Sequence, residues 1–275
     1  MKRRIIQILS AIATNGYIQG FLQSTIYQGK TKVVCVPGLN CYSCPGALGA
    51  CPIGSLQGSL GRKDQHFSLY VLGFLLAFSV LFGRLICGFL CPFGFLQELI
   101  YKIKTKKIKV KEKIDSKLRY LKYVILLVFV IILPIFLTGD YGISSPYFCK
   151  WICPGGTLEA GIPLVLGNED LQLLIGWLFS WKVFVLVVVL VMSLFIHRFF
   201  CKYMCPLGAL YGLFNKIGFY TLSIDQEKCT NCKACHRACL MNVKVTENPN
   251  SAECIRCGDC KSACPTDAIK LGFKK

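Results

Sequence analysis

The sequence predicts a mainly α-helical protein that is embedded in a membrane and ends in a small α+β domain. Three observations lead to this prediction: the chain is very apolar, its cysteines recur at fixed spacings, and its positive charge gathers beside apolar stretches. Hydrophobic residues make up 54% of the 275 residues and the mean hydropathy is +0.52, which is high for a soluble domain. We expect a membrane domain in residues 1–217 and the small domain in residues 218–275.

The first apolar stretch, Met1–Leu22, starts with the basic run MKRR and is only weakly apolar. A cleaved signal peptide would have its cleavage site at Ala11–Ala13, but the apolar core Ile5–Leu9 is short for that role. An amphipathic helix at the membrane surface is another interpretation. We favour a retained first membrane helix.

Three further stretches are more strongly apolar: Phe67–Leu90, Tyr120–Leu137 and Trp181–Ile196. Each is close to the ~20 residues that a helix needs to cross a bilayer. The stretch Leu164–Ser180 is interrupted by Asn-Glu-Asp and is more typical of an interfacial or re-entrant segment. The sequence therefore predicts a multi-pass protein with about four transmembrane helices.

The distribution of lysine and arginine predicts the orientation in the cell membrane. Formal net charge is +18, and the most basic part of the membrane region is Lys102–Lys122. Because cytoplasmic loops collect positive charge, this segment, the N-terminus and the tail after His197 are expected in the cytoplasm. The charge lies beside apolar spans, so membrane topology explains it and no nucleic-acid partner is expected.

The tail contains two runs of four cysteines, CTNCKACHRAC from Cys229 and CIRCGDCKSACP from Cys254. The spacing C-x2-C-x2-C-x3-C, twice, is typical of two [4Fe–4S] cubes in which the fourth ligand of each cube comes from the other run. Zinc prefers two well-separated C-x2-C pairs and fits less well. The expected sets are Cys229, Cys232, Cys235 and Cys264 for one cube, and Cys254, Cys257, Cys260 and Cys239 for the other. Such thiolates need a reducing compartment, which agrees with a cytoplasmic tail. The tail is therefore expected to fold as a two-cluster, ferredoxin-like α+β domain.

The membrane region contains an internal repeat. The segment GRLICGFLCPFGFLQELIYKI from Gly83 matches HRFFCKYMCPLGALYGLFNKI from His197, and CPIGSLQG from Cys51 matches CPGGTLEAG from Cys153. We interpret this as a duplication about an axis along the membrane normal, which places both inner motifs at one depth. The aligned pairs include Arg84 with Arg198, Cys87 with Cys201, and Cys91 with Cys205.

Each inner motif reads C-x3-C-P, and cysteines at i and i+4 share one helix face. Two facing copies offer four thiolates, so a third cluster, either a cube or [2Fe–2S], is predicted at Cys87, Cys91, Cys201 and Cys205. Arg84 and Arg198 would offset the negative charge of that cluster and raise its potential. The alternative for both arginines is an interaction with lipid headgroups.

A second membrane cluster is predicted on the outer side. Cys149 and Cys153 form another C-x3-C-P, and the segment CVPGLNCYSCPGALGACP carries more cysteines. The aligned position in that segment is Ala47, although Cys51 is kept, so the ligands are expected to be Cys149, Cys153, Cys51 and either Cys41 or Cys44. Disulfides or a thiol relay are the alternatives, because the outer face is oxidising in many cells.

The motifs CGFLCP, CKYMCP and the eight tail cysteines resemble those of NapH-type and NosR-type polyferredoxin membrane proteins, a family that includes MauN. The resemblance covers most of the chain from Leu72 on. It implies electron transfer between a quinol pool or a cytoplasmic donor and an acceptor across the membrane. Some members carry a flavin-bearing outer domain that is not found here, which implies a separate extracytoplasmic flavoprotein. The additional outer cysteines depart from the family pattern and weaken any link to nitrate or nitrous oxide metabolism.

We therefore expect a membrane electron-transfer protein with one or two clusters beyond those of the tail. Its expected partners are lipid, a cytoplasmic ferredoxin, flavodoxin or reductase, an outer flavoprotein, and a quinone. No substrate bond needs to be broken by this chain, so oxidoreductase activity is expected only in a complex. Three alternatives stay open: a quinol dehydrogenase subunit with its clusters on the cytoplasmic side, a membrane thiol–disulfide relay, and a redox-sensing maturation factor.

Overall fold

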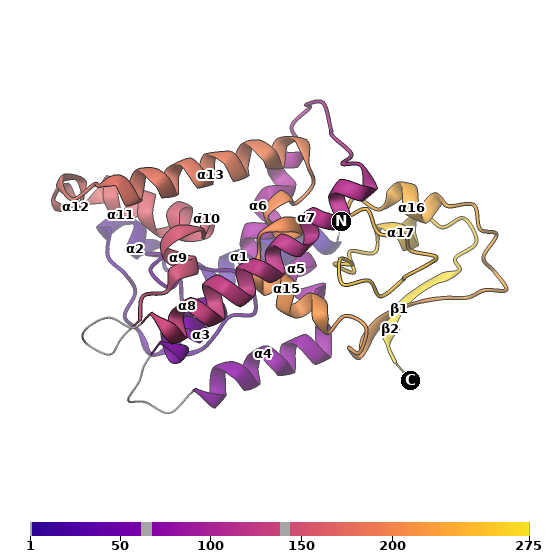
Figure 1. Cartoon of the computed structure of the whole chain (residues 1–275), viewed down its shortest axis with the longest axis horizontal. Helices are drawn as coiled ribbons and strands as arrows, with labels where there is room; N and C mark the ends of the chain where they lie inside the picture. The colour runs from indigo at the N-terminus through magenta and orange to yellow at the C-terminus, as the bar shows by residue number, and fades with distance from the viewer. Residues whose placement is uncertain (1, 62–67, 138–143, 275) are drawn as a thin grey trace.

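A computed structural model of the chain describes residues 2–61, 68–137 and 144–274. Helices form an elongated bundle, and a small domain with a two-stranded sheet sits at one end of it (Figure 1). The prediction of a mainly α-helical protein is confirmed. Phe67, where the second predicted span begins, and residues 138–143 of the predicted outer loop lie outside the described residues.

Three helical segments run lengthwise through the bundle (Figure 1). They are α4 (Leu69–Phe82), α13 (Trp177–Phe195), and α7 (Glu112–Ile125) continued by η2 (Leu126–Ile132) and α8 (Leu133–Phe136). Glu112–Phe136 and Trp177–Phe195 are long and apolar enough to cross a membrane, and α4 is a shorter apolar helix. Leu127 and Phe184 are more than half exposed on these helices, as expected of surfaces that face lipid.

The span Glu112–Phe136 widens into π-helical turns, η2, just before Pro134. Proline has no N–H to bond to the carbonyl four residues earlier, and its ring crowds that carbonyl. A π-helical segment is one way in which a helix adjusts locally to such a break. The span thus continues to Phe136 with proline inside it.

Four of the five cysteine-proline pairs in the membrane region begin a helix, whereas the fifth, Cys44-Pro45, lies in a turn. The four helices are α3 (Pro52–Leu60), α6 (Pro92–Tyr101), α10 (Pro154–Gly156) and α15 (Pro206–Leu213). Proline suits the first helical position because its missing N–H has no partner there. In three cases the cysteine sulfur accepts the N–H of the residue three positions on, at 3.4 Å. Short helices carry the preceding cysteine of each C-x3-C-P motif: α5 (Leu85–Phe89), α9 (Tyr147–Trp151) and α14 (Phe199–Tyr203).

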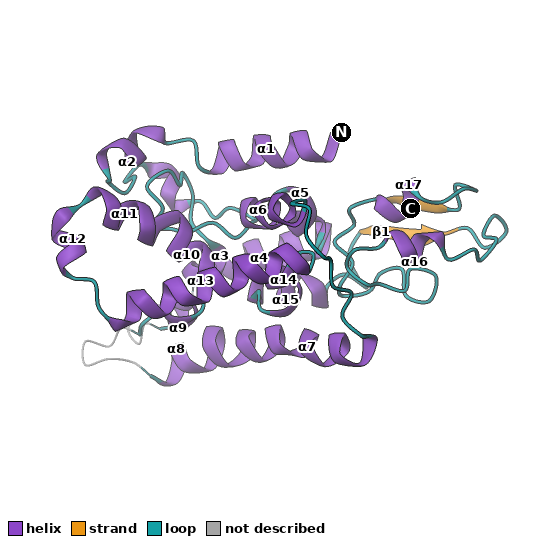
Figure 2. Cartoon of the chain, turned by 90° about the horizontal axis from the view of Figure 1, so that it is seen from above, coloured by secondary structure: helices purple, strands orange, loops and turns teal. Residues whose placement is uncertain are grey.

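The stretch expected as one N-terminal membrane helix forms two helices, α1 (Lys2–Thr14) and α2 (Ile18–Gln23). Asn15 and Gly16, residues typical of turns, separate them. Helix α1 packs along one side of the bundle (Figure 2). Its polar residues contact the inner motif, with Gln7 donating to the Gly88 carbonyl at 2.9 Å and Ser10 to the Leu90 carbonyl at 2.9 Å.

The other short elements gather at the end of the bundle opposite the small domain (Figure 1). They are η1 (Lys30–Val33), η3 (Thr157–Gly161), α11 (Ile162–Gly167) and α12 (Glu169–Leu173). The last two take up part of the stretch Leu164–Ser180, which was expected to be interfacial. Leu173 is largely exposed.

The small C-terminal domain combines two strands with two short helices. Strand β1 (Tyr220–Ile224) pairs antiparallel with β2 (Ile269–Phe273), and α16 (Ala234–Ala238) and α17 (Asp259–Ser262) lie between them in sequence. Buried polar bonds fix this domain to the bundle. Arg256 donates to the carbonyls of Phe82 and Asn215, both at 2.7 Å, and the Asn215 amide donates to the Cys254 carbonyl at 2.8 Å.

We expect Gly88→Ala to weaken this docking. A Cβ at Gly88 would come within 2.5 Å of the Ile255 carbonyl oxygen. Backbone atoms cannot move aside as a flexible side chain can, so overpacking of about 1–3 kcal/mol is expected. The measurement is the thermal unfolding midpoint of the detergent-solubilised protein. Gly73→Ala is the control because nothing lies within 4 Å of that position; equal midpoints for both variants would contradict the contact.

Candidate metal centres

The eight tail cysteines line two separate cavities. One is lined by Cys229, Cys232, Cys235 and Cys264, and the other by Cys239, Cys254, Cys257 and Cys260 together with His197. Each set contains three cysteines of one run and one of the other, which is the grouping expected from the spacing. We call these the distal and proximal tail sets.

The two tail sets differ in exposure. Cys232 is exposed, and the pKa of its thiol is lowered because the Ala234 N–H donates to the sulfur. The Thr266 hydroxyl likewise lowers the pKa of Cys264. In the proximal set, burial raises the pKa of Cys257 to about 12 and that of Cys260 to about 12. The distal set, with the exposed Cys232, is therefore the more accessible of the two.

The inner set, Cys87, Cys91, Cys201 and Cys205, meets where α5 and α6 face α14 and α15. All four side chains are buried. The Cys205 sulfur interacts electrostatically with those of Cys201, Cys87 and Cys91, so both motifs contribute to one site. Within the described residues, no three cysteine, histidine or acidic side chains converge tightly enough to hold a single metal ion.

Arg84 and Arg198 join the two inner motifs reciprocally. Both side chains are 0% exposed. Arg84 Nη2 donates to the Cys201 carbonyl at 2.8 Å, and Arg198 Nη1 donates to the Cys87 carbonyl. Each guanidinium thus binds the backbone of the cysteine in the other motif. This burial excludes an interaction of either arginine with lipid headgroups.

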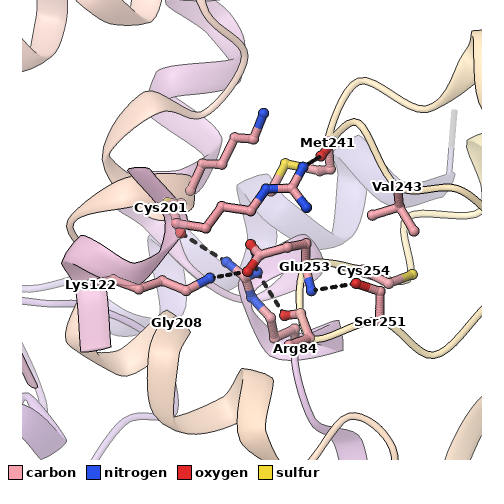
Figure 3. Close-up of polar contacts among 12 residues, drawn as sticks. Arg84, Lys122, Cys201, Gly208, Met241, Val243, Ser251, Glu253 and Cys254 are labelled. Atoms are coloured by element: carbon pink, nitrogen blue, oxygen red, sulfur yellow. Dashed lines mark hydrogen bonds and ion pairs between the residues drawn. The ribbon is translucent and has the colours of Figure 1, made fainter. Parts of the chain in front are cut away.

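Two buried carboxylates balance these arginines. Glu253 of the tail domain binds Arg84 at 2.8 Å and Lys122 at 2.5 Å (Figure 3). Glu98 binds Arg198 at 2.9 Å and also Arg3 of α1 at 2.8 Å. Its partners are 95 and 100 residues away in the chain, beyond the reach of any local pattern.

The outer set consists of Cys41, Cys51, Cys149 and Cys153, which line a cavity of about 920 Å³. The Cys153 sulfur interacts electrostatically with the other three. Of the two candidates for the fourth position, the structure brings Cys41 into the set. Its backbone N–H donates to Glu159 Oε2 at 2.7 Å, and burial raises the pKa of that carboxyl to about 7.

Cys44 points elsewhere. It is 1% exposed and its sulfur lies 3.6 Å from Asn15 Oδ1, outside the lining of the outer cavity. Cys35 also lies outside that lining and has its sulfur 3.9 Å from Ser55 Oγ. All eighteen cysteines are free thiols in the described structure.

Tyr211 is a site residue that sequence reasoning missed. It is fully buried in α15, the helix that follows Cys205, and its hydroxyl donates to the Pro37 carbonyl at 2.9 Å. This bond links the inner motif to the chain segment that leads to Cys41 of the outer set. Gln57 and Gln97 were missed as well. The sequence did contain a signal for these three residues, since each follows the cysteine of a Cys-Pro pair by the same number of positions.

Comparisons with known proteins agree with these sites. A family model described as a 4Fe-4S binding domain matches residues 65–111, 123–162 and 175–219, and another of the same description matches 248–270. An uncharacterized protein of Methanocaldococcus jannaschii, MJ0750, is 35% identical over 79% of this chain and 82% of its own length. A second one, MJ0749, is 32% identical over 73% of this chain and 68% of its own.

Ferredoxin-type protein NapH of Haemophilus influenzae is 26% identical over 78% of this chain and 72% of its own length. Proteins named NosR and MauN also match. No solved structure matches the chain.

Proposed function

We propose that the chain conducts electrons through four cysteine-bound clusters. The premise is that it belongs to the ferredoxin-type 4Fe–4S family of NapH, NosR and MauN and is thus a membrane iron–sulfur electron-transfer protein. The observation that carries the proposal is the continuity of the four sets. In the proposed order they follow one another as distal tail, proximal tail, inner and outer set, and residues adjoining each set pack against residues adjoining the next.

The contacts between neighbouring sets support this order. In the tail, Cys260 of the proximal set interacts with Cys235 of the distal set. Ile255, which lies between two proximal cysteines, contacts Gly88, which lies between two inner cysteines. Tyr211 links the inner motif to the segment that leads to the outer set, and a Cβ at Gly38 would be 3.0 Å from the Cys91 Cα.

The donor sets fit iron–sulfur clusters, which accept and release single electrons at potentials set by their surroundings. The chain's own residues would provide those surroundings. Four thiolates make a cluster anionic, and the buried Arg84 and Arg198 beside the inner set would offset that charge. Because no water reaches either guanidinium, the effect on the inner set is stronger than at a surface.

We propose that the tail domain and Lys102–Lys122 face the cytoplasm and the outer cavity faces the other side. The positive-inside rule supports this orientation, as does the arrangement of α3, α9 and α10, which carry or follow the outer cysteines and lie in the part of the bundle away from the tail domain (Figure 1). The exposed Cys232 would then meet a cytoplasmic ferredoxin, flavodoxin or reductase. An outer flavoprotein is the proposed partner at the far end, and lipid covers α4, η2 and α13.

A second candidate is a quinol dehydrogenase subunit. The outer cavity favours it, because about 920 Å³ is within the range of small-molecule sites and Val71, Ala160 and Leu164 make part of its lining apolar. A quinone analogue that binds this cavity would protect its cysteines from a thiol-labelling reagent. Such protection would favour the quinol dehydrogenase, and its absence would favour the first candidate.

Iron and acid-labile sulfide in the intact, anaerobically purified chain test the proposal. Four cubes would give roughly sixteen irons per chain, and Cys205→Ser is expected to remove about four of them. Cys35→Ser, outside every set, is the control and is expected to keep all iron. The proposed electron path would be contradicted if Cys205→Ser kept all its iron while Cys235→Ser and Cys260→Ser together removed all of it. That result would favour a thiol relay.

A further inference from the structure

Two buried glutamines occupy equivalent places beside the two membrane sets. Gln57 stands in CPIGSLQ and Gln97 in CPFGFLQ, so each follows its Cys-Pro cysteine at the same offset. Their side chains are 1% and 0% exposed. A buried amide must find hydrogen-bond partners, because leaving it unpaired in the interior is costly.

Both glutamines bind equivalent groups of the facing motif, and each also donates to the carbonyl four residues earlier in its own helix, at 3.3 Å for Gln57 and 3.4 Å for Gln97. Gln97 Nε2 lies 3.1 Å from the Cys201 sulfur, and Gln97 Oε1 accepts the Phe200 N–H at 3.0 Å. At the outer set, Gln57 Nε2 lies 3.4 Å from the Cys149 sulfur, and Gln57 Oε1 accepts the Phe148 N–H at 2.9 Å. In both sites the amide extends from the helix after one Cys-Pro pair to the first cysteine of the facing motif.

This pairing fixes which end of each amide faces the sulfur. A backbone N–H can donate only to the amide oxygen, so the NH2 group is left to face the cysteine. The sulfur of a ligating cysteine is a thiolate and accepts such a bond. At the inner set the cysteines and Gln97 are all buried, so no solvent molecule competes for the Cys201 sulfur and the interaction is strengthened.

The equivalent position in the other two motifs holds a different group. Glu159 follows Cys153 and accepts the Cys41 N–H, and Tyr211 follows Cys205 and donates to Pro37. Neither donates to a cysteine sulfur in these contacts. Each membrane set therefore has one glutamine amide aimed at one cysteine, and the two sites match.

We propose that Gln57 and Gln97 are positioning residues that orient one cysteine of the outer and inner set, respectively, and raise the reduction potential of the cluster bound there. This inference rests on the proposed function. An N–H donor stabilises negative charge on the sulfur, and the reduced cluster carries more of it than the oxidised one, so the bond favours reduction.

The test uses Gln97→Met and Gln57→Met in the full-length protein, with redox titrations followed by electron paramagnetic resonance. Methionine has a similar volume but no N–H donor. We expect Gln97→Met to lower the midpoint of the inner site, by about 59 mV if its reduction equilibrium changes tenfold, and to leave the outer and tail signals in place. Gln57→Met is expected to lower the midpoint of the outer site and to leave the inner and tail signals in place, so each variant is the control for the other.

Gln97→Glu and Gln57→Glu guard against a packing effect, since a carboxylate still accepts the backbone N–H but cannot donate to sulfur. We expect them to lower the same midpoints further, because they add negative charge. Three results would overturn this inference but not the proposed function. They are normal iron with unchanged midpoints, equal midpoint shifts at both sites, and loss of a site's iron in both of its variants. A wild-type chain without iron outside the tail would overturn the proposed function as well as this inference.

Discussion

Changing Cys41 to serine is expected to remove roughly four irons per chain, whereas changing Cys44 to serine is expected to remove none. The two cysteines are close in sequence and both are largely enclosed, but only Cys41 lines the outer cavity with Cys51, Cys149 and Cys153. Cys44 instead contacts Asn15. Because a cube takes a thiolate at each of its four irons, only the Cys41 variant leaves the outer site incomplete, and the iron content is measured directly by elemental analysis.

The pair provides its own control, since both variants make the same chemical change. The outer signal in electron paramagnetic resonance is expected to disappear only in the Cys41 variant, while the tail signals persist in both. Loss of iron from Cys44→Ser with full iron in Cys41→Ser would mean that the loop Cys35–Cys51 takes another register when the site is filled.

Glu253→Ala is expected to be the most destabilising change of a single charged residue. This carboxylate is the shared partner of Arg84 and Lys122, which are both completely buried (Figure 3). Removing it leaves two positive charges in the interior without a counter-ion, and breaking a buried pair in this way costs about 3–5 kcal/mol. The free energy of unfolding is measured by denaturation of the detergent-solubilised protein.

Because Glu253 belongs to the tail domain and its partners belong to the bundle, we expect Glu253→Ala also to loosen the docking of the tail domain on the bundle. Faster proteolysis near residues 214–219, between α15 and β1, is expected in Glu253→Ala. Glu227→Ala removes an exposed acid of the same domain and is expected to change neither readout. A Glu253 variant as stable as the Glu227 variant would show that this network does not hold the domains together.

Local patterns predict the parts of this molecule that depend on local geometry. Cysteine spacing predicts the grouping of Cys239 with the second tail run, because a short loop presents three thiolates easily and the fourth must come from elsewhere. Hydropathy predicts the span that ends at Phe136 but places its start at Tyr120. The helix in fact begins at Glu112, because its first turns are polar yet packed: Asp115 binds Lys202 of α14 at 2.5 Å, and Arg119 donates to the Met241 carbonyl of the tail domain at 3.1 Å.

Contacts between distant residues could not be predicted in this way. The repeat places Ala47 where a ligand would be expected, and nothing in the spacing distinguishes Cys41 from Cys44 as its replacement. That choice depends on how the loop after Val33 folds over the outer cavity. Arg3 and Glu98 are likewise paired only because α1 folds back onto the inner motif.

The separation of each cysteine set along the chain has a consequence for biosynthesis. No set is complete until its last member has left the ribosome, which happens at Cys153 for the outer set, Cys205 for the inner set, and Cys260 and Cys264 for the tail. The nascent chain therefore exposes half-sites with reactive thiols for much of its synthesis. Helix α1 is made before Gly88 and Glu98 and can dock only after both have followed it, so it waits for later segments before it reaches its final place.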